Sequence, residues 1–114
     1  MTKQMGGRKL GVTSSHRRAL LKNMATSLFL HEKVETTLAK AKELRPFAER
    51  IITEAKKGKH YMVRRKIHDK TVYRKLFEVL APRYAQRPGG YTRILRLAPR
   101  SGDNALRGLV ALVS

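Results

Sequence analysis

A serine, a histidine and two arginines follow one another at the start of a helix-like segment, and together they have the chemistry of a phosphate site. The run is Ser15-His16-Arg17-Arg18. The first turn of a helix is electropositive, so clustered cations there are unfavourable unless an anion binds among them. Unpaired backbone N–H groups, a hydroxyl and guanidinium groups suit a phosphate. For the two arginines alone, the sequence leaves open the alternative that they simply point into water.

The segment that carries this run is predicted to be an amphipathic helix from about Ser15 to Leu30. Its apolar residues recur at spacings of three and four, the pattern of one helix face: Leu21, Met24, Ala25 and Leu28. Ser14 or Ser15 can cap the start of the helix by accepting a hydrogen bond from a backbone N–H group.

The balance of charge points to a polyanionic partner. The 114 residues include 26 Lys and Arg but only 8 Asp and Glu, which gives a net charge of +18. Self-repulsion of this size disfavours a compact chain unless it is neutralised, and nucleic acid is a better candidate than an anionic membrane. The sequence has no cysteine, no apolar run long enough to span a bilayer and no secretory signal pattern. We therefore expect a soluble, cytoplasmic protein.

The charge is also uneven along the chain. No acid precedes Glu32, and from Val79 onward every cation is arginine and the sole acid is Asp103. Two purely cationic ends around a mixed middle suggest two phosphate-contacting regions. Residues 1–13 contain three glycines and little apolar surface, so we expect a flexible basic arm before a single domain of residues 14–114.

The middle of the chain predicts one strand and three helices. Residues 34–38 alternate apolar and polar types, which indicates a short strand. A long helix over 39–57, kinked at Pro46, is preferred to a shorter helix that would begin at Pro46. A short helix is expected over 60–68. Asp69 then caps a further helix that ends before Pro82 and whose apolar stripe is Val72, Leu76, Val79 and Leu80.

Two β segments, 91–97 and 109–113, are separated by a turn-rich linker and predict an antiparallel hairpin. A hairpin alone is marginal, so the strand near Val34 should join it. The expected fold is a two-layer α/β (α+β) domain with a small three-stranded mixed sheet. The chain order is α-β-α-α-α-β-β, with helices covering the sheet.

The sequence offers little that could support catalysis. Its four histidines show no metal-ligand spacing, and Gly89-Gly90 lacks the pattern of a nucleotide-binding loop. We expect no enzyme activity, no metal and no cofactor. Among the aromatics, core packing is favoured for Tyr73, whereas Tyr84 and Tyr91 could equally pack in the core or stack on bases.

Several runs resemble one family, bacterial large-subunit ribosomal protein seventeen. They are Gly7-Arg8-Lys9-Leu10, Ser14-Ser15-His16-Arg17, Val34-Glu35-Thr36-Thr37 followed by Lys40-Ala41-Lys42-Glu43-Leu44-Arg45, Gly89-Gly90-Tyr91-Thr92-Arg93-Ile94-Leu95, and Gly102-Asp103-Asn104-Ala105. The match covers nearly the whole chain in the right order. It departs at Thr2-Lys3-Gln4-Met5 and at Gly11-Val12-Thr13, where the family usually has other residues.

The resemblance implies a structural constituent of the ribosome that binds large-subunit (23S-type) ribosomal RNA and helps to assemble and stabilise the subunit. It also implies neighbouring ribosomal proteins near the polypeptide exit side, with no membrane and no small-molecule substrate. By position it matches Arg45 and several of the basic residues found above. The residues we expect to bind RNA are Lys3, Arg8, Lys9, Ser15, His16, Arg17, Arg18, Lys22, Lys40, Lys42, Arg83, Arg87, Tyr91, Arg93 and Arg100.

Two other classes of protein remain as alternatives. A non-specific DNA-binding architectural protein of the nucleoid would share the charge, but such proteins often show a dimer interface or a long basic ribbon. A basic RNA-modifying enzyme would need a cofactor loop or an acid–base pair, and the sequence shows neither.

Overall fold

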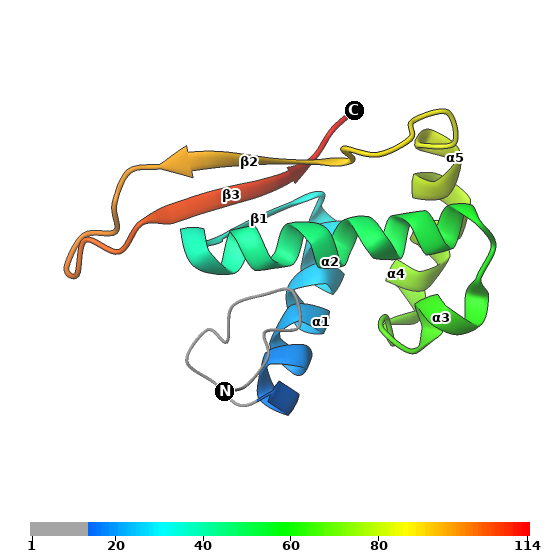
Figure 1. The fold of residues 1–114 in the computed structure, drawn as a ribbon, viewed down its shortest axis with the longest axis horizontal. Coiled ribbons are helices and arrows are strands. Elements are labelled where there is room, and N and C mark those ends of the chain that lie inside the picture. The colour runs from blue at the N-terminus through cyan, green and yellow to red at the C-terminus, as the bar shows by residue number, and fades with distance from the viewer. Residues whose placement is uncertain (1–13) are drawn as a thin grey trace, which may run out of the picture.

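The computed structural model describes residues 14–114, which form an α+β domain (Figure 1). Its elements, in chain order, are α1 (Ser14–His31), β1 (Lys33–Thr37), α2 (Leu38–Lys56), α3 (His60–Arg64), α4 (Lys70–Lys75), the π-helical turn η1 (Leu76–Leu80), α5 (Ala81–Arg83), β2 (Thr92–Leu97) and β3 (Arg107–Leu112). This confirms the predicted class and the predicted order of helices and strands.

The sheet has the order β1-β3-β2, and both pairs are antiparallel. The prediction of a mixed sheet is therefore wrong. β1 and β2 point in the same direction, but β3 lies between them, so they never become a parallel pair. Val110 of β3 pairs with Val34 on one side and with Ile94 on the other. The predicted hairpin of β2 and β3, joined by β1, is confirmed.

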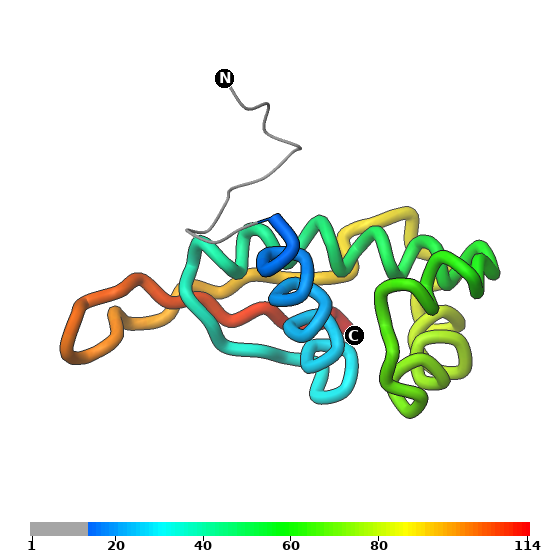
Figure 2. The backbone as a smooth tube through the Cα atoms, turned by 90° about the horizontal axis from the view of Figure 1, so that it is seen from below, coloured from blue at the N-terminus to red at the C-terminus, as the bar shows by residue number. Residues whose placement is uncertain are grey.

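The helices lie on one side of the sheet, with α2 running along it and α3, α4 and α5 gathered around the end of α2 beyond the sheet (Figures 1 and 2). α2 approaches β3 closely at Gly108. A Cβ added there would stand 3.2 Å from the Cβ of Ala41 and 3.3 Å from Cδ1 of Leu38. Glycine at this position therefore lets the helix pack directly against the strand.

The two long helices form much as the sequence predicts. α1 begins at Ser14, so both serines lie in its first turn, and the residue before them falls outside the described residues. It buries Leu21, Ala25, Leu28 and Phe29. α2 is one helix that contains Pro46, as preferred over the shorter alternative, and the Thr37 hydroxyl caps it by accepting a hydrogen bond from the Lys40 N–H group.

The segment after α3 differs from its prediction in two ways. Asp69 caps α4 as expected, because its carboxylate accepts a hydrogen bond from the Val72 N–H group at 3.1 Å. Val79, however, is 44% exposed rather than part of the apolar stripe. Helical turns also continue past Pro82, which lies in the first turn of α5, where a missing N–H group is tolerated. The π turn widens the helix here, so that the Ala81 N–H group donates to the carbonyl of Leu76.

The core lies where these elements meet. α1, α2, the α3–α5 region and β3 contribute fully buried side chains to one cluster, among them Leu28, Phe29, Leu44, Ile51, Ile52, Val72, Leu76 and Val110. Across residues 14–114, none of the helices is both long enough and apolar enough to cross a membrane.

Candidate nucleic-acid interface

The predicted phosphate site occupies the first turn of α1. Ser15, His16 and Arg18 are exposed there, and Arg17 is half-buried. The turn contains no acid to offset the helix dipole. Lys22, one turn further along, is also half-buried. The structure therefore keeps together the backbone N–H groups, the hydroxyl and the cations that the sequence placed in this run.

Lys40 and Lys42 lie in the first turns of α2, which likewise begins without an acid. Lys42 is exposed and lines a shallow hollow of about 370 Å³ with Thr37 and Leu106, where α2 meets the loop before β3. This basic end of α2 lies at the loop end of the β2–β3 hairpin, where the Leu38 N–H group donates to the Leu106 carbonyl at 2.9 Å.

Arg87 and Arg93 come together beside the C-terminal end of β3. Both line a hollow of about 350 Å³ that also includes Val113 and Ser114. Both side chains are exposed, and the Arg87 guanidinium donates a hydrogen bond to the Gly90 carbonyl at 3.4 Å. Two guanidinium groups on one open hollow fit the two-pronged recognition of phosphate that arginine favours.

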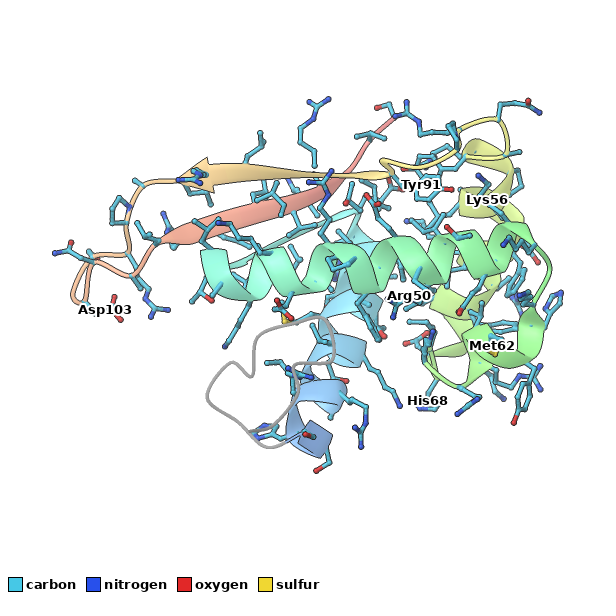
Figure 3. The ribbon with its side chains drawn as sticks, in the orientation of Figure 1. Arg50, Lys56, Met62, His68, Tyr91 and Asp103 are labelled. Atoms are coloured by element: carbon cyan, nitrogen blue, oxygen red, sulfur yellow. The ribbon has the colours of Figure 1, made fainter. Side chains whose placement is uncertain are left out.

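Arg83 and Arg100, by contrast, are engaged by carboxylates of the protein. Arg83 holds Glu32 through two hydrogen bonds of 2.8 and 3.1 Å, and Arg100 holds Asp103 through bonds of 2.8 and 3.2 Å. Asp103 lies at the tip of the β2–β3 hairpin (Figure 3). The hydrogen bonds from Arg100 and from the Ala105 N–H group lower the pKa of Asp103 to about 2. As RNA contacts, both arginines stay predictions.

The Tyr91 ring packs in the core, which was one of the two alternatives that the sequence left open, and an RNA contact through this residue stays a prediction. Tyr91 is only 1% exposed, and its ring lies against that of Tyr84, with centroids 5.1 Å apart. Lys56 of α2 lies beside it (Figure 3) and donates a hydrogen bond to its hydroxyl at 2.8 Å. Burial raises the pKa of the Tyr91 hydroxyl, but hydrogen bonds from Lys56 and Thr53 and the charge of Lys56 together outweigh it, so the pKa is lowered. Core packing prevails for both tyrosines, because their rings lie against each other and both belong to the hydrophobic core cluster.

Glu32 joins three elements and should make stability depend on pH. It accepts hydrogen bonds from Arg83 and is 3.0 Å from the Lys75 ammonium group, and these two partners lower its pKa from 4.5 to about 2. Because the folded pKa is below the unfolded value, this stabilisation is present above about pH 4.5 and is lost as the pH falls towards 2.

We therefore expect Glu32→Gln to reduce the free energy of unfolding by about 1 kcal/mol at pH 7, since solvent screens this partly exposed group. The difference from the wild type should shrink below pH 4. Denaturant unfolding between pH 3 and 7 measures it, with Glu78→Gln at an exposed acid as the control. A difference that did not change with pH would contradict the role given to Glu32.

The other acids of the chain are also largely used internally. Five of the eight are paired with basic side chains within residues 14–114, namely Glu32, Glu35, Glu49, Glu54 and Asp103. Six cations form these pairs: Arg45, Lys66, Lys75, Arg83, Arg100 and Arg107. Since the chain has 26 basic but only 8 acidic residues, pairing of this kind cannot neutralise its positive charge.

Some predicted residues are not placed, and others were missed. Lys3, Arg8 and Lys9, together with the predicted basic arm, lie outside the described residues. The structure adds three cations that the sequence did not assign, Arg64, Lys70 and Arg74, which line one cavity between α3 and α4. Their signal in the sequence was the run of basic residues from His60 to Lys75, but only the fold shows which of them share a site. In the part of the chain that the structure describes, no group of three or more His, Cys, Asp or Glu side chains could hold a metal ion.

The fold and the charge define a small basic α+β protein whose surface is suited to a polyanion. The family model for ribosomal protein L17 matches residues 20–113, and the chain belongs to this family. Three of the curated relatives called large ribosomal subunit protein bL17 match over nearly their whole length. The protein of Elusimicrobium minutum is 57% identical over 113 residues, which cover 99% of both chains. That of Halothermothrix orenii is 51% identical over 96% of this chain and 98% of its own, and that of Endomicrobium trichonymphae is 48% identical over the full length of both.

Membership of the family confirms the resemblance seen in the sequence. It also identifies the chain as a ribosomal protein with a structural rather than an enzymatic role.

Proposed function

We propose that the protein is a constituent of the large ribosomal subunit, where it binds 23S-type ribosomal RNA and helps to assemble and stabilise the particle. It would act in the cytoplasm beside other large-subunit proteins near the polypeptide exit side. The observation that carries the proposal is the excess positive charge, +18, on a chain whose acids are largely paired internally. The relatives' name, large ribosomal subunit protein, supports the choice of this subunit.

The RNA would meet three parts of the chain. The first is the start of α1, where Ser15, His16 and Arg18 are exposed beside the N–H groups of the first helical turn. The second is the hollow that Arg87 and Arg93 line. The third is a basic arm of residues 1–13, which we propose as a segment distinct from the single domain of residues 14–114. Because the arm leads directly into α1, the arm and the helix start would contact the same stretch of RNA.

Sedimentation of a cell lysate at low salt tests this proposal. We expect the protein to migrate with large subunits and to be released as salt is raised, because phosphate contacts weaken with ionic strength. RNase treatment should release it, whereas DNase should not. Migration with nucleoid DNA, and release by DNase alone, would instead favour a DNA-binding architectural protein.

A further inference from the structure

A cavity of about 670 Å³ lies between α3 and the α4–η1 segment, on the opposite side of the domain from the hairpin tip. His68, at the loop between α3 and α4, is one of its lining residues (Figure 3). Its volume is within the range of sites that hold small organic groups. None of the residues from which the sequence predicted RNA binding lines it. We call it the α3–α4 pocket.

Three aromatic rings form one cluster in the α3–α4 pocket, and two of them are stacked. His60 lies on Phe77 with centroids 3.9 Å apart and planes within 11° of parallel. Tyr73 completes the cluster, with its ring centroid 4.9 Å from that of Phe77 and its hydroxyl 2.7 Å from Nδ1 of His60. Because His60 is exposed, a further planar group can reach its ring.

Cations surround these rings. Arg64, Lys70 and Arg74 line the same pocket, and all three are exposed. The Arg64 guanidinium also lies over the Tyr73 ring, 5.4 Å from its centroid. Glu78 is the one acid among the lining residues, and its carboxylate can accept a hydrogen bond from the edge of a base.

The backbone beneath the pocket is irregular. Phe77 and Glu78 belong to η1, a π-helical turn between α4 and α5. Such turns are rare and occur often at functional sites, where they shift side chains out of the ordinary helical register. Stability alone would not favour a rim of cations around half-buried rings. Packing of the core therefore does not account for the whole arrangement.

We propose that the α3–α4 pocket receives one unpaired base of the ribosomal RNA, which stacks on His60 while its flanking phosphates contact Arg64, Lys70 and Arg74. An aromatic platform with a basic rim is the usual way in which proteins hold an unstacked RNA base. A small anion would not stack on the rings, and an apolar protein segment would not pair with the cations. The inference rests on the proposed function, because it takes ribosomal RNA as the partner.

The test measures binding of the full-length protein to a transcript of large-subunit ribosomal RNA over a range of salt concentrations. His60→Ala should weaken binding by about fivefold or more at every salt concentration, because stacking does not depend on counterion release. Arg74→Ala should instead reduce the slope of log affinity against log salt by about one. His60→Phe keeps a planar ring and should restore most of the affinity lost in His60→Ala.

Tyr61→Ala is the matched control. Tyr61 is the neighbouring aromatic residue on α3, it is 73% exposed, and it does not line the pocket. Its loss should leave RNA affinity unchanged, and thermal melts of each variant check that folding is intact. Ultraviolet cross-linking of the wild-type complex should attach RNA to the peptide that carries His60 or Tyr73.

The outcomes separate this inference from the function on which it rests. If the wild-type protein binds the transcript but His60→Ala binds equally well, the base pocket is refuted and the proposed function stands. If the wild type does not bind at all, both fail. If His60→Ala binds naked RNA normally but loses a protein neighbour in assembled subunits, the pocket is a protein-docking site, and the inference is overturned in favour of that role.

Discussion

Replacing Tyr91 with alanine is expected to destabilise the protein by about 3–5 kcal/mol, the usual cost of removing a large buried aromatic side chain. The ring is 1% exposed and packs on Tyr84, whose hydroxyl donates a hydrogen bond to the carbonyl of Val113. Its own hydroxyl accepts a hydrogen bond from the Lys56 ammonium group. The substitution therefore creates a cavity and also removes this acceptor from Lys56. Thermal melting should show a fall of roughly 10–20 °C.

Two variants show whether burial is the cause. Tyr91→Phe keeps the ring and removes only the hydroxyl, so it should cost about 1 kcal/mol. Tyr61→Ala removes an aromatic ring that is 73% exposed and should change the melting temperature little. If Tyr91→Ala melted close to the wild type but bound RNA poorly, base stacking, the other alternative that the sequence left open, would be correct, and the core would not depend on this ring.

Tyr91 also shows where sequence reasoning loses its power. The spacing of Leu21, Ala25 and Leu28 is enough to predict the buried face of α1, because a helix repeats its neighbours every three to four residues. Tyr91 stands alone between a glycine loop and a strand, and its partners are distant in the sequence: Lys56 in α2, Tyr84 just after α5 and Val113 after β3. No local pattern reports contacts across such separations, so core and surface were evenly matched until the fold was known.

The same limit applies to the mixed sheet and to Pro82. The hairpin of β2 and β3 follows from two β segments with a turn between them. Whether β1 then pairs with β2 or with β3 depends on how α2 packs on the sheet, and the sequence does not show this. Pro82 ordinarily ends a helix, and the sequence alone does not show that the π turn before it widens the helix enough to continue.

The net charge, in contrast, follows from composition alone. Which cations are paired within the protein and which face a partner does not. Arg83 and Arg93 look alike in the sequence, each in an arginine-rich region with few acids. In the fold, Arg83 pairs with Glu32, which is 51 residues away, whereas Arg93 lines a hollow together with Arg87. Ion pairs between distant residues thus decide which cations are available to a partner. The cations of the α3–α4 pocket were likewise visible in the sequence but could not be grouped without the fold.

This division of the arginines leads to the prediction with the largest effect on binding. Affinity for large-subunit ribosomal RNA should fall by about 10³- to 10⁵-fold between 50 and 200 mM salt if six to ten phosphates are contacted. Each contact contributes about −0.9 to the slope of log affinity against log salt on a duplex, and about −0.7 on a single strand. Filter binding over a salt series gives this slope directly.

Variants then assign parts of the slope to residues. Arg93→Ala should lower it by about one and leave the melting temperature nearly unchanged, because an exposed arginine adds little to stability. Arg83→Ala should do the reverse, lowering stability through the loss of its pair with Glu32 and changing the slope less. Deleting residues 1–13 removes Lys3, Arg8 and Lys9 and should lower the slope by as much as about three, with little effect on folding.

A salt series without a slope would refute the electrostatic account for the whole chain. A slope that Arg83→Ala reduced as much as Arg93→Ala would show that RNA displaces Glu32 from Arg83. In that case the ion pairs would break when RNA binds, and their cations would become available to it. The surface that contacts RNA would then be larger than the one that the unbound fold presents.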